Sequence, residues 1–172
     1  MPLNVEIKAR TRRADEIRQI LRDLGAEDLG TDNQTDTYFF CPNGRMKLRQ
    51  GKIENNLIFY RRNNQAGPKT AKVMLHKTSP GDELRSLLSA ALGVWKVVVK
   101  AREIYFIGNV KFHIDQVKNL GSFVEIEAID TDGTYSEEQL LSQCNHYMKT
   151  LGIEQRDLLT HSYSDMVGEG EI

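Results

Sequence analysis

Three consecutive strand-like runs within residues 97–127 constrain the fold of this chain more than any other stretch. Each run alternates apolar and charged residues with a period of two, and successive side chains of a strand point to opposite faces. The charged face would carry Lys100 and Arg102 from the first run, Lys111, His113 and Asp115 from the second, and Glu125 and Glu127 from the third. The stretch therefore predicts a sheet with one strongly charged face and one apolar face.

The same alternation recurs earlier in the chain. Residues 3–10 place Glu6 and Lys8 on one face. Residues 45–49 likewise place Lys47 and Arg49 on one face, and residues 57–62 end in two arginines. A helical period of apolar residues marks residues 11–24, 82–92 and 137–151 instead. Many antiparallel strands with a few helices predict a closed barrel or two packed sheets.

The helices decide which sheet face points inward. In an ordinary small barrel the apolar face fills the interior and the charged face meets water, and this alternative stays open for any single strand. Three amphipathic helices, however, each need an apolar surface to cover. If they cover the outer faces of the strands, the charged faces line the interior. We therefore expect a charged bore.

Charges of both signs would line this bore, and burying them is costly unless they are paired or meet a charged ligand. Lysine and arginine match phosphate oxygens, and clustered carboxylates match Mg²⁺ or Mn²⁺. A metal–polyphosphate complex therefore fits better than a bare anion. The expected interior residues are Glu6, Lys8, Lys47, Arg49, Arg61, Lys100, Arg102, Asp115, Glu125 and Glu127.

The composition gives no support to several other classes. The 23 basic and 24 acidic residues leave a net charge of −1, so we expect no nucleic-acid and no membrane partner. No apolar run approaches the roughly 20 residues of a membrane span, and the N-terminus lacks the apolar segment of a signal peptide. Two cysteines without metal-ligand spacing predict reduced thiols in a cytoplasmic protein. A length of 172 residues predicts a single domain, 1–172.

Five segments resemble one family in their order along the chain: VEIKAR, QTDTYFF, GRMKLRQ, LIFYRR and the long VKAREIYFIGNVKFHIDQVKNLGSFVEIE. The chain is similar in these to the CYTH, or triphosphate tunnel metalloenzyme, superfamily. That superfamily includes class IV adenylate cyclases, thiamine triphosphatases and inorganic triphosphatases. The likeness covers nearly the whole chain, and GPK followed by SALGVWKVVVKARE most resembles the class IV cyclase-like branch.

The resemblance implies an α+β fold, an eight-stranded antiparallel closed barrel with flanking helices, and roles for single residues. It implies a metal site, Mg²⁺ or Mn²⁺, at Glu6, Asp115, Glu125 and Glu127. It implies triphosphate binding by Lys8, Lys47, Arg49, Arg61, Lys100 and Arg102, with Lys8, Glu6 and Arg61 also catalytic. One departure is Asn4, which stands where the family's E-x-E-x-K strand has its first glutamate. A neutral oxygen there predicts a weaker or single metal site.

These features together predict a metal-dependent enzyme acting on a small-molecule triphosphate, with hydrolysis as the leading reaction. The alternatives are a class IV-type adenylate cyclase, which makes cyclic AMP and pyrophosphate from ATP, and a non-catalytic polyphosphate- or nucleotide-binding module. His113 would carry a proton or, as we favour, hydrogen-bond within the tunnel. The sequence does not distinguish a monomer from a homodimer.

Overall fold

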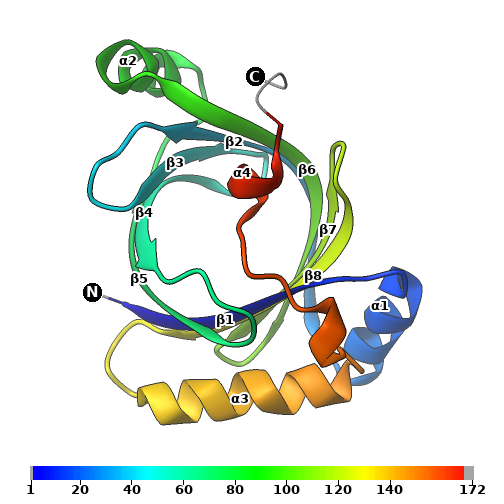
Figure 1. The fold of residues 1–172 in the computed structure, drawn as a ribbon. Helices are drawn as coiled ribbons and strands as arrows, with labels where there is room; N and C mark the ends of the chain where they lie inside the picture. The colour runs from blue at the N-terminus through cyan, green and yellow to red at the C-terminus, as the bar shows by residue number, and fades with distance from the viewer. Residues whose placement is uncertain (1, 169–172) are drawn as a thin grey trace.

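A computed structural model describes residues 2–168, and within them eight antiparallel strands close into a barrel (Figure 1). Around the ring the strands run in the order β1-β5-β4-β3-β2-β6-β7-β8. They are β1 (Leu3–Arg10), β2 (Glu27–Phe39), β3 (Arg45–Gln50), β4 (Asn55–Arg62), β5 (Lys69–Lys77), β6 (Val94–Ile107), β7 (Val110–Val117) and β8 (Gly121–Asp130). The predicted eight-stranded antiparallel barrel with flanking helices is confirmed.

The strand β2 begins well before the QTDTYFF segment, residues 34–40. Its first half pairs with β6 from Glu27 opposite Phe106, although this stretch is polar and mostly exposed. The register shifts between Asp28 and Gly30, and Gly30 takes a φ of 95°. Glycine adopts this positive φ without strain, so the irregularity there is permitted.

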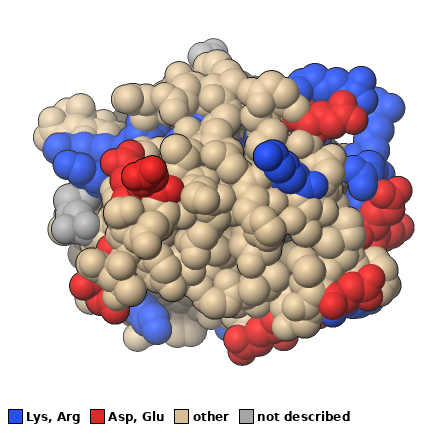
Figure 2. Space-filling view, turned by 90° about the horizontal axis from the view of Figure 1, so that it is seen from below, with Lys and Arg blue, Asp and Glu red and all other residues tan. Residues whose placement is uncertain are grey.

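Two helices cover one side of the barrel. α1 (Ala14–Asp23) and α3 (Glu137–Thr150) bury Ile17, Leu21 and Leu140 against the outer apolar faces of β1, β7 and β8. Ser136 caps the N-terminus of α3 in a capping box, pairing reciprocally with Gln139. Seen from the α3 side, the surface is largely uncharged at its centre, with charged side chains towards its margins (Figure 2).

The third helix behaves differently from the expectation that every helix covers the sheet. α2 (Glu83–Leu92) buries no residue, and Leu87 is 62% exposed. It joins β5 to β6 and lies beyond the rim of the barrel (Figure 1). None of the helices within residues 2–168 is long and apolar enough to cross a membrane.

The chain after α3 returns across one end of the barrel (Figure 1). It contains the 3₁₀ turn η1 (Gln155–Asp157) and the short helix α4 (Tyr163–Met166). Lys69 donates a hydrogen bond to the Thr160 carbonyl at 2.8 Å, and Lys96 donates one to the Val167 carbonyl at 3.2 Å. Side chains that point into the barrel therefore hold this C-terminal segment in place.

Candidate functional site

A cavity of about 470 Å³ occupies the barrel interior, which we call the tunnel. Its size lies in the range of about 300–1,000 Å³ that is typical of small-molecule sites. Alternation along each strand turns the charged side chains inward, as the sequence predicts for a barrel with an apolar exterior. The charged lining residues are Glu6, Lys8, Lys47, Arg49, Glu54, Arg62, Lys100, Arg102, Lys111, Glu125 and Glu127.

One cluster of ions forms where β6, β7 and β8 lie side by side. Arg102 donates two hydrogen bonds to Asp115, at 2.7 and 2.6 Å, and a third to Glu125 at 2.9 Å. Glu125 also forms an ion pair with Lys8 at 2.9 Å, and the Tyr163 hydroxyl donates a hydrogen bond to Asp115 at 2.8 Å. Both carboxylates are therefore compensated by cations before any ligand arrives.

A second cluster centres on Asp36, which is fully buried on β2. Its oxygens accept two hydrogen bonds from Arg49, at 2.9 and 2.8 Å. Lys47 and Lys100 lie 3.1 and 3.3 Å from the same carboxylate. Three basic side chains thus surround one carboxylate, an arrangement that suits a phosphate chain.

The position of Arg61 corrects the prediction that this residue grips the triphosphate. Along β4 the residues Asn56, Ile58, Tyr60 and Arg62 point inward. Arg61 falls on the other parity, is exposed, and donates to the Asn43 carbonyl at 2.8 Å. Arg62 occupies the tunnel instead and pairs with Glu6. The two-residue period therefore assigns the inward cation of this strand to Arg62.

The carboxylates expected to bind metal are divided between different partners. Among residues 2–168 no group of three or more His, Cys, Asp or Glu side chains is placed to hold a metal ion. Asp115 and Glu125 are engaged by Arg102, Lys8 and His113, which favours ion pairing for these two. Metal binding by the full set of Glu6, Asp115, Glu125 and Glu127 stays a prediction.

An oxygen-rich corner nevertheless forms between β1 and β8. Glu6 stands directly opposite Glu127, and the Asn4 amide nitrogen donates to Glu127 at 2.5 Å. The Asn4 amide oxygen is buried and has no hydrogen-bond partner among the described residues. Two carboxylates and one unpaired amide oxygen are the hard donors that Mg²⁺ or Mn²⁺ accepts, so these residues fit a single divalent cation.

Burial shifts the protonation of the tunnel residues. Burial and the neighbouring Arg102 hold the pKa of Lys100 well below its ordinary value. Burial raises the pKa of Glu125, but Lys8 and Arg102 outweigh it and hold that pKa well below the usual range. Burial, aided by Arg102, lowers the pKa of His113 to about 3, so its ring is neutral near pH 7.

The neutral ring of His113 has a defined orientation. Its Nδ1 lies 2.8 Å from Glu125, and because a carboxylate only accepts, Nδ1 carries the proton. Its Nε2 is then an acceptor, buried and without a partner among the described residues. Hydrogen bonding within the tunnel, the role favoured from sequence, agrees with this geometry.

Several lining residues escaped sequence reasoning. Lys111 lies on the predicted charged face together with His113, yet it is absent from the expected interior residues. Glu54 lies just before β4, where no alternation exists, yet it accepts from Arg49 at 2.9 Å and pairs with Lys111. Tyr163 comes from the C-terminal segment and packs its ring 3.6 Å from the Lys8 ammonium. Only the fold brings these last two residues to the tunnel.

The sequence model of the CYTH domain matches residues 2–163, so the chain belongs to the CYTH family. This confirms the resemblance drawn from the five ordered motifs. A curated Methanocaldococcus jannaschii protein named as a putative adenylate cyclase is 24% identical over 180 residues. That alignment covers 96% of this chain and 99% of the relative.

Solved structures share the fold. A protein of Pyrococcus horikoshii OT3 superposes with a TM-score of 0.79 at 21% identity, over 96% of this chain and 99% of that one. A Hippeastrum protein, described as a putative adenylyl cyclase with a dominant triphosphatase activity, has a TM-score of 0.63 at 14% identity. Its match covers 100% of this chain and 97% of that chain. At these identities the likeness shows a common fold.

Proposed function

We propose that this protein is a metal-dependent triphosphatase that hydrolyses a triphosphate bound in the tunnel. The observation that carries the proposal is the convergence of basic side chains from five strands on one cavity. These side chains are Lys8, Lys47, Arg49, Arg62, Lys100, Arg102 and Lys111. Membership of the CYTH family and the triphosphatase activity ascribed to the Hippeastrum relative support it.

The chain's own residues would bind and orient the phosphates. Arg49 and Arg102 are fixed by bidentate contacts to Asp36 and Asp115, so their guanidinium groups need little reorganisation when an anion arrives. Such preorganised charge stabilises the oxygens of a phosphoryl group in transfer. Water attacks the terminal phosphorus, the bond to the bridging oxygen breaks, and orthophosphate and a diphosphate leave. The proton of the attacking water passes to solvent or product.

The corner formed by Asn4, Glu6 and Glu127 would hold the Mg²⁺ or Mn²⁺ ion of this reaction. When bound, such an ion would neutralise charge on the phosphate oxygens. Glu6 also forms an ion pair with Arg62, which would place the Arg62 guanidinium beside this corner. Lys8, tied to Glu125, would orient a phosphate or the attacking water.

A class IV-type adenylate cyclase is the second candidate, favoured by the name of the Methanocaldococcus jannaschii relative. In that reaction the ribose 3′-hydroxyl attacks the α-phosphorus and pyrophosphate leaves. The same cations would serve it. The two reactions differ in which phosphorus meets the nucleophile.

The test is a product assay with Mg²⁺ and with Mn²⁺ on ATP, thiamine triphosphate and inorganic triphosphate. Orthophosphate with a diphosphate product is expected, and Lys100→Met should lower its rate of formation. Cyclic AMP with pyrophosphate would select the cyclase. Tight triphosphate binding without any product under either metal would select a binding module instead.

A further inference from the structure

The loop between β3 and β4 folds back onto one buried carboxylate. Asp32 of β2 is 0% exposed, and its Oδ1 accepts hydrogen bonds from the backbone nitrogens of Lys52 at 2.7 Å and Ile53 at 3.1 Å. Its Oδ2 accepts a third from the backbone nitrogen of Glu54 at 3.0 Å. Three successive backbone amides therefore donate to one side chain, and that side chain fixes the conformation of the loop.

Close packing restricts the same loop further. A Cβ atom at Gly51 would clash with both carboxylate oxygens of Asp32, so the close approach of loop and carboxylate requires glycine there. Gln34 Nε2 also donates to Asp32, at 2.9 Å, and the Asn55 side chain donates to the Gly51 carbonyl at 2.7 Å. The loop is therefore held along its whole length.

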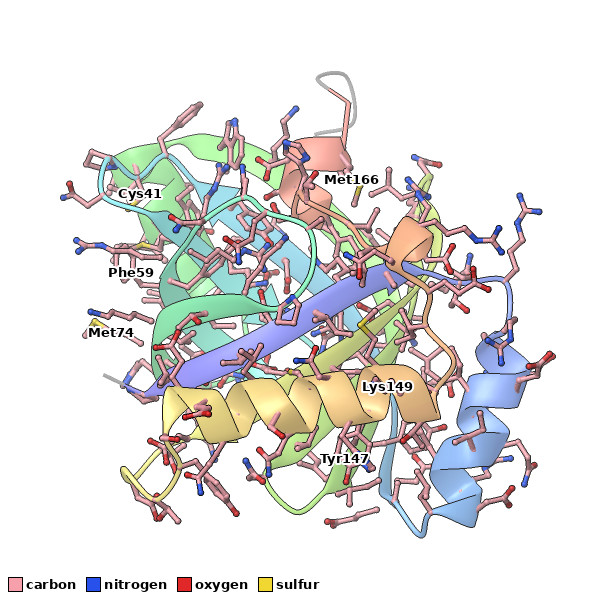
Figure 3. All side chains as sticks on the ribbon, turned by 60° about the horizontal axis from the view of Figure 1, so that its bottom comes forward. Cys41, Phe59, Met74, Tyr147, Lys149 and Met166 are labelled. Atoms are coloured by element: carbon pink, nitrogen blue, oxygen red, sulfur yellow. The ribbon has the colours of Figure 1, made fainter. Side chains whose placement is uncertain are left out.

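The anchored loop places the Glu54 side chain in the tunnel. Its Oε2 accepts a hydrogen bond from Arg49 at 2.9 Å, and its Oε1 pairs with the Lys111 ammonium. Burial raises the pKa of Glu54, but Arg49 and Lys111 outweigh it and hold that pKa below the usual range. Further along β4, side chains of the other parity leave the interior, and Phe59 points away from the barrel (Figure 3). Glu54 is thus a charged carboxylate on the inner side.

Glu54 occupies positions on these two cations that an anionic ligand would use. Arg49 donates Nε and Nη2 to Asp36, which leaves Nη1, and Nη1 donates to Glu54. Among residues 2–168, Glu54 is also the one acidic partner of Lys111. A phosphate oxygen that approaches Arg49 Nη1 and Lys111 therefore competes with the Glu54 carboxylate.

This competition defines a role for Glu54 in binding. Resting on the proposed function, we propose that Glu54 is an internal counter-anion that a bound triphosphate displaces from Arg49 and Lys111. Asp32 is the positioning residue that holds it there. In the empty tunnel Glu54 compensates two cations that would otherwise lie buried without a partner. When the triphosphate binds, the same negative charge opposes it and lowers the affinity.

The test is calorimetric titration of inorganic triphosphate in the absence of divalent metal, so that binding is measured without turnover. Glu54→Gln should lower the Kd about ten-fold, the scale of one charge–charge contact inside a protein. Glu103→Gln is the matched control, because Glu103 pairs with Arg18 at 2.6 Å on the outer side of β6. It should leave the Kd within about two-fold, since substitutions away from the site have small effects.

A double-mutant cycle separates positioning from a general loosening of the fold. Asp32→Asn replaces one acceptor oxygen by a donor, so it releases the loop and should lower the Kd by less than Glu54→Gln does. In the Glu54→Gln background the same substitution should leave the Kd within about two-fold, because the group that Asp32 positions is already gone. A purely structural role of Asp32 would change the Kd equally in both backgrounds.

The outcomes separate this inference from the proposed function. Equal Kd values for the wild type and Glu54→Gln, or an equal effect of Asp32→Asn in both backgrounds, would overturn the inference and leave the triphosphatase intact. If Asp32→Asn does not fold, Gly51→Ala takes its place in the cycle, because its methyl group displaces the loop from Asp32. Tighter binding by Glu54→Gln without hydrolysis of any triphosphate under Mg²⁺ or Mn²⁺ would support the counter-anion and contradict the triphosphatase. Binding of triphosphate by neither protein would overturn both.

Discussion

Arg102 and Asp115 face each other across β6 and β7 and pair through two hydrogen bonds of 2.7 and 2.6 Å. Neither side chain is more than 3% exposed. Arg102 reaches Glu125 with the same terminal nitrogen, so one guanidinium links β7 to β8. The pair therefore has two effects. It compensates the charge of a buried carboxylate, and it fixes the position of a guanidinium on the tunnel wall.

Asp115→Asn should lower the free energy of unfolding by about 3 kcal/mol, because removing one partner leaves Arg102 buried and only partly compensated. Urea denaturation measures the loss. Asp15→Asn breaks the pair with Arg18 at a fully solvated carboxylate and should cost less than about 1 kcal/mol. Similar losses for both variants would show that the buried Arg102–Asp115 pair stabilises the fold no more than the exposed Arg18–Asp15 pair.

Arg62→Gln should lower kcat/KM for the triphosphate about 10–100-fold, the scale of one or two hydrogen bonds to a charged group. Arg61→Gln makes the same chemical change on the outer side of the wall and should leave kcat/KM within about two-fold, since substitutions away from the site have small effects. Steady-state kinetics on both variants decide the matter. A larger effect at Arg61 would contradict the inward parity of β4.

Acid should destabilise the fold through His113. Its pKa falls to about 3 in the folded chain from an ordinary value of 6.5, so between these values the unfolded chain binds the additional proton. The free energy of unfolding should therefore fall as the pH falls, by at most about 1.4 kcal/mol per unit. Denaturation curves between pH 6.5 and 5 measure the slope. His113→Gln should flatten it, and an unchanged slope would contradict the buried neutral ring.

Glu127→Gln should weaken binding of Mn²⁺ at least ten-fold, because the amide lacks the negative charge of the carboxylate. Asn4→Glu should strengthen it by adding a third carboxylate to the corner. Electron paramagnetic resonance of free Mn²⁺ gives the affinity without any turnover. Glu54→Gln serves as the control, since Glu54 lies in the other ion cluster. Equal affinity in all four proteins would exclude the Asn4 corner as the metal site.

The charged interior could be predicted because its signal is local. Alternation in β6, β7 and β8 fixes which side chains share a face, and helices with apolar stripes fix which face is covered. The prediction that Arg61 points into the tunnel was wrong for a related reason. Two consecutive arginines lie on opposite faces, and choosing between them required the parity of Tyr60, which points into the tunnel.

The remaining lining could not be predicted from the sequence. Glu54 precedes its strand and Tyr163 lies in a short C-terminal helix, so no periodicity links either residue to the tunnel. Their contacts with Lys111 and Lys8 depend on closure of the barrel between β1 and β8. This closure pairs strands that are far apart in the sequence, and local sequence patterns do not determine the register in which they pair.

The most direct test of the central claim is hydrolysis of ATP in ¹⁸O-labelled water with Mg²⁺ or Mn²⁺, followed by ³¹P NMR and mass spectrometry. If water attacks the terminal phosphorus in the tunnel, one ¹⁸O atom should appear in orthophosphate and none in ADP. The same assay is run on thiamine triphosphate and inorganic triphosphate. Formation of cyclic AMP with unlabelled pyrophosphate from ATP, or the absence of labelled orthophosphate from all three triphosphates, would contradict a triphosphatase.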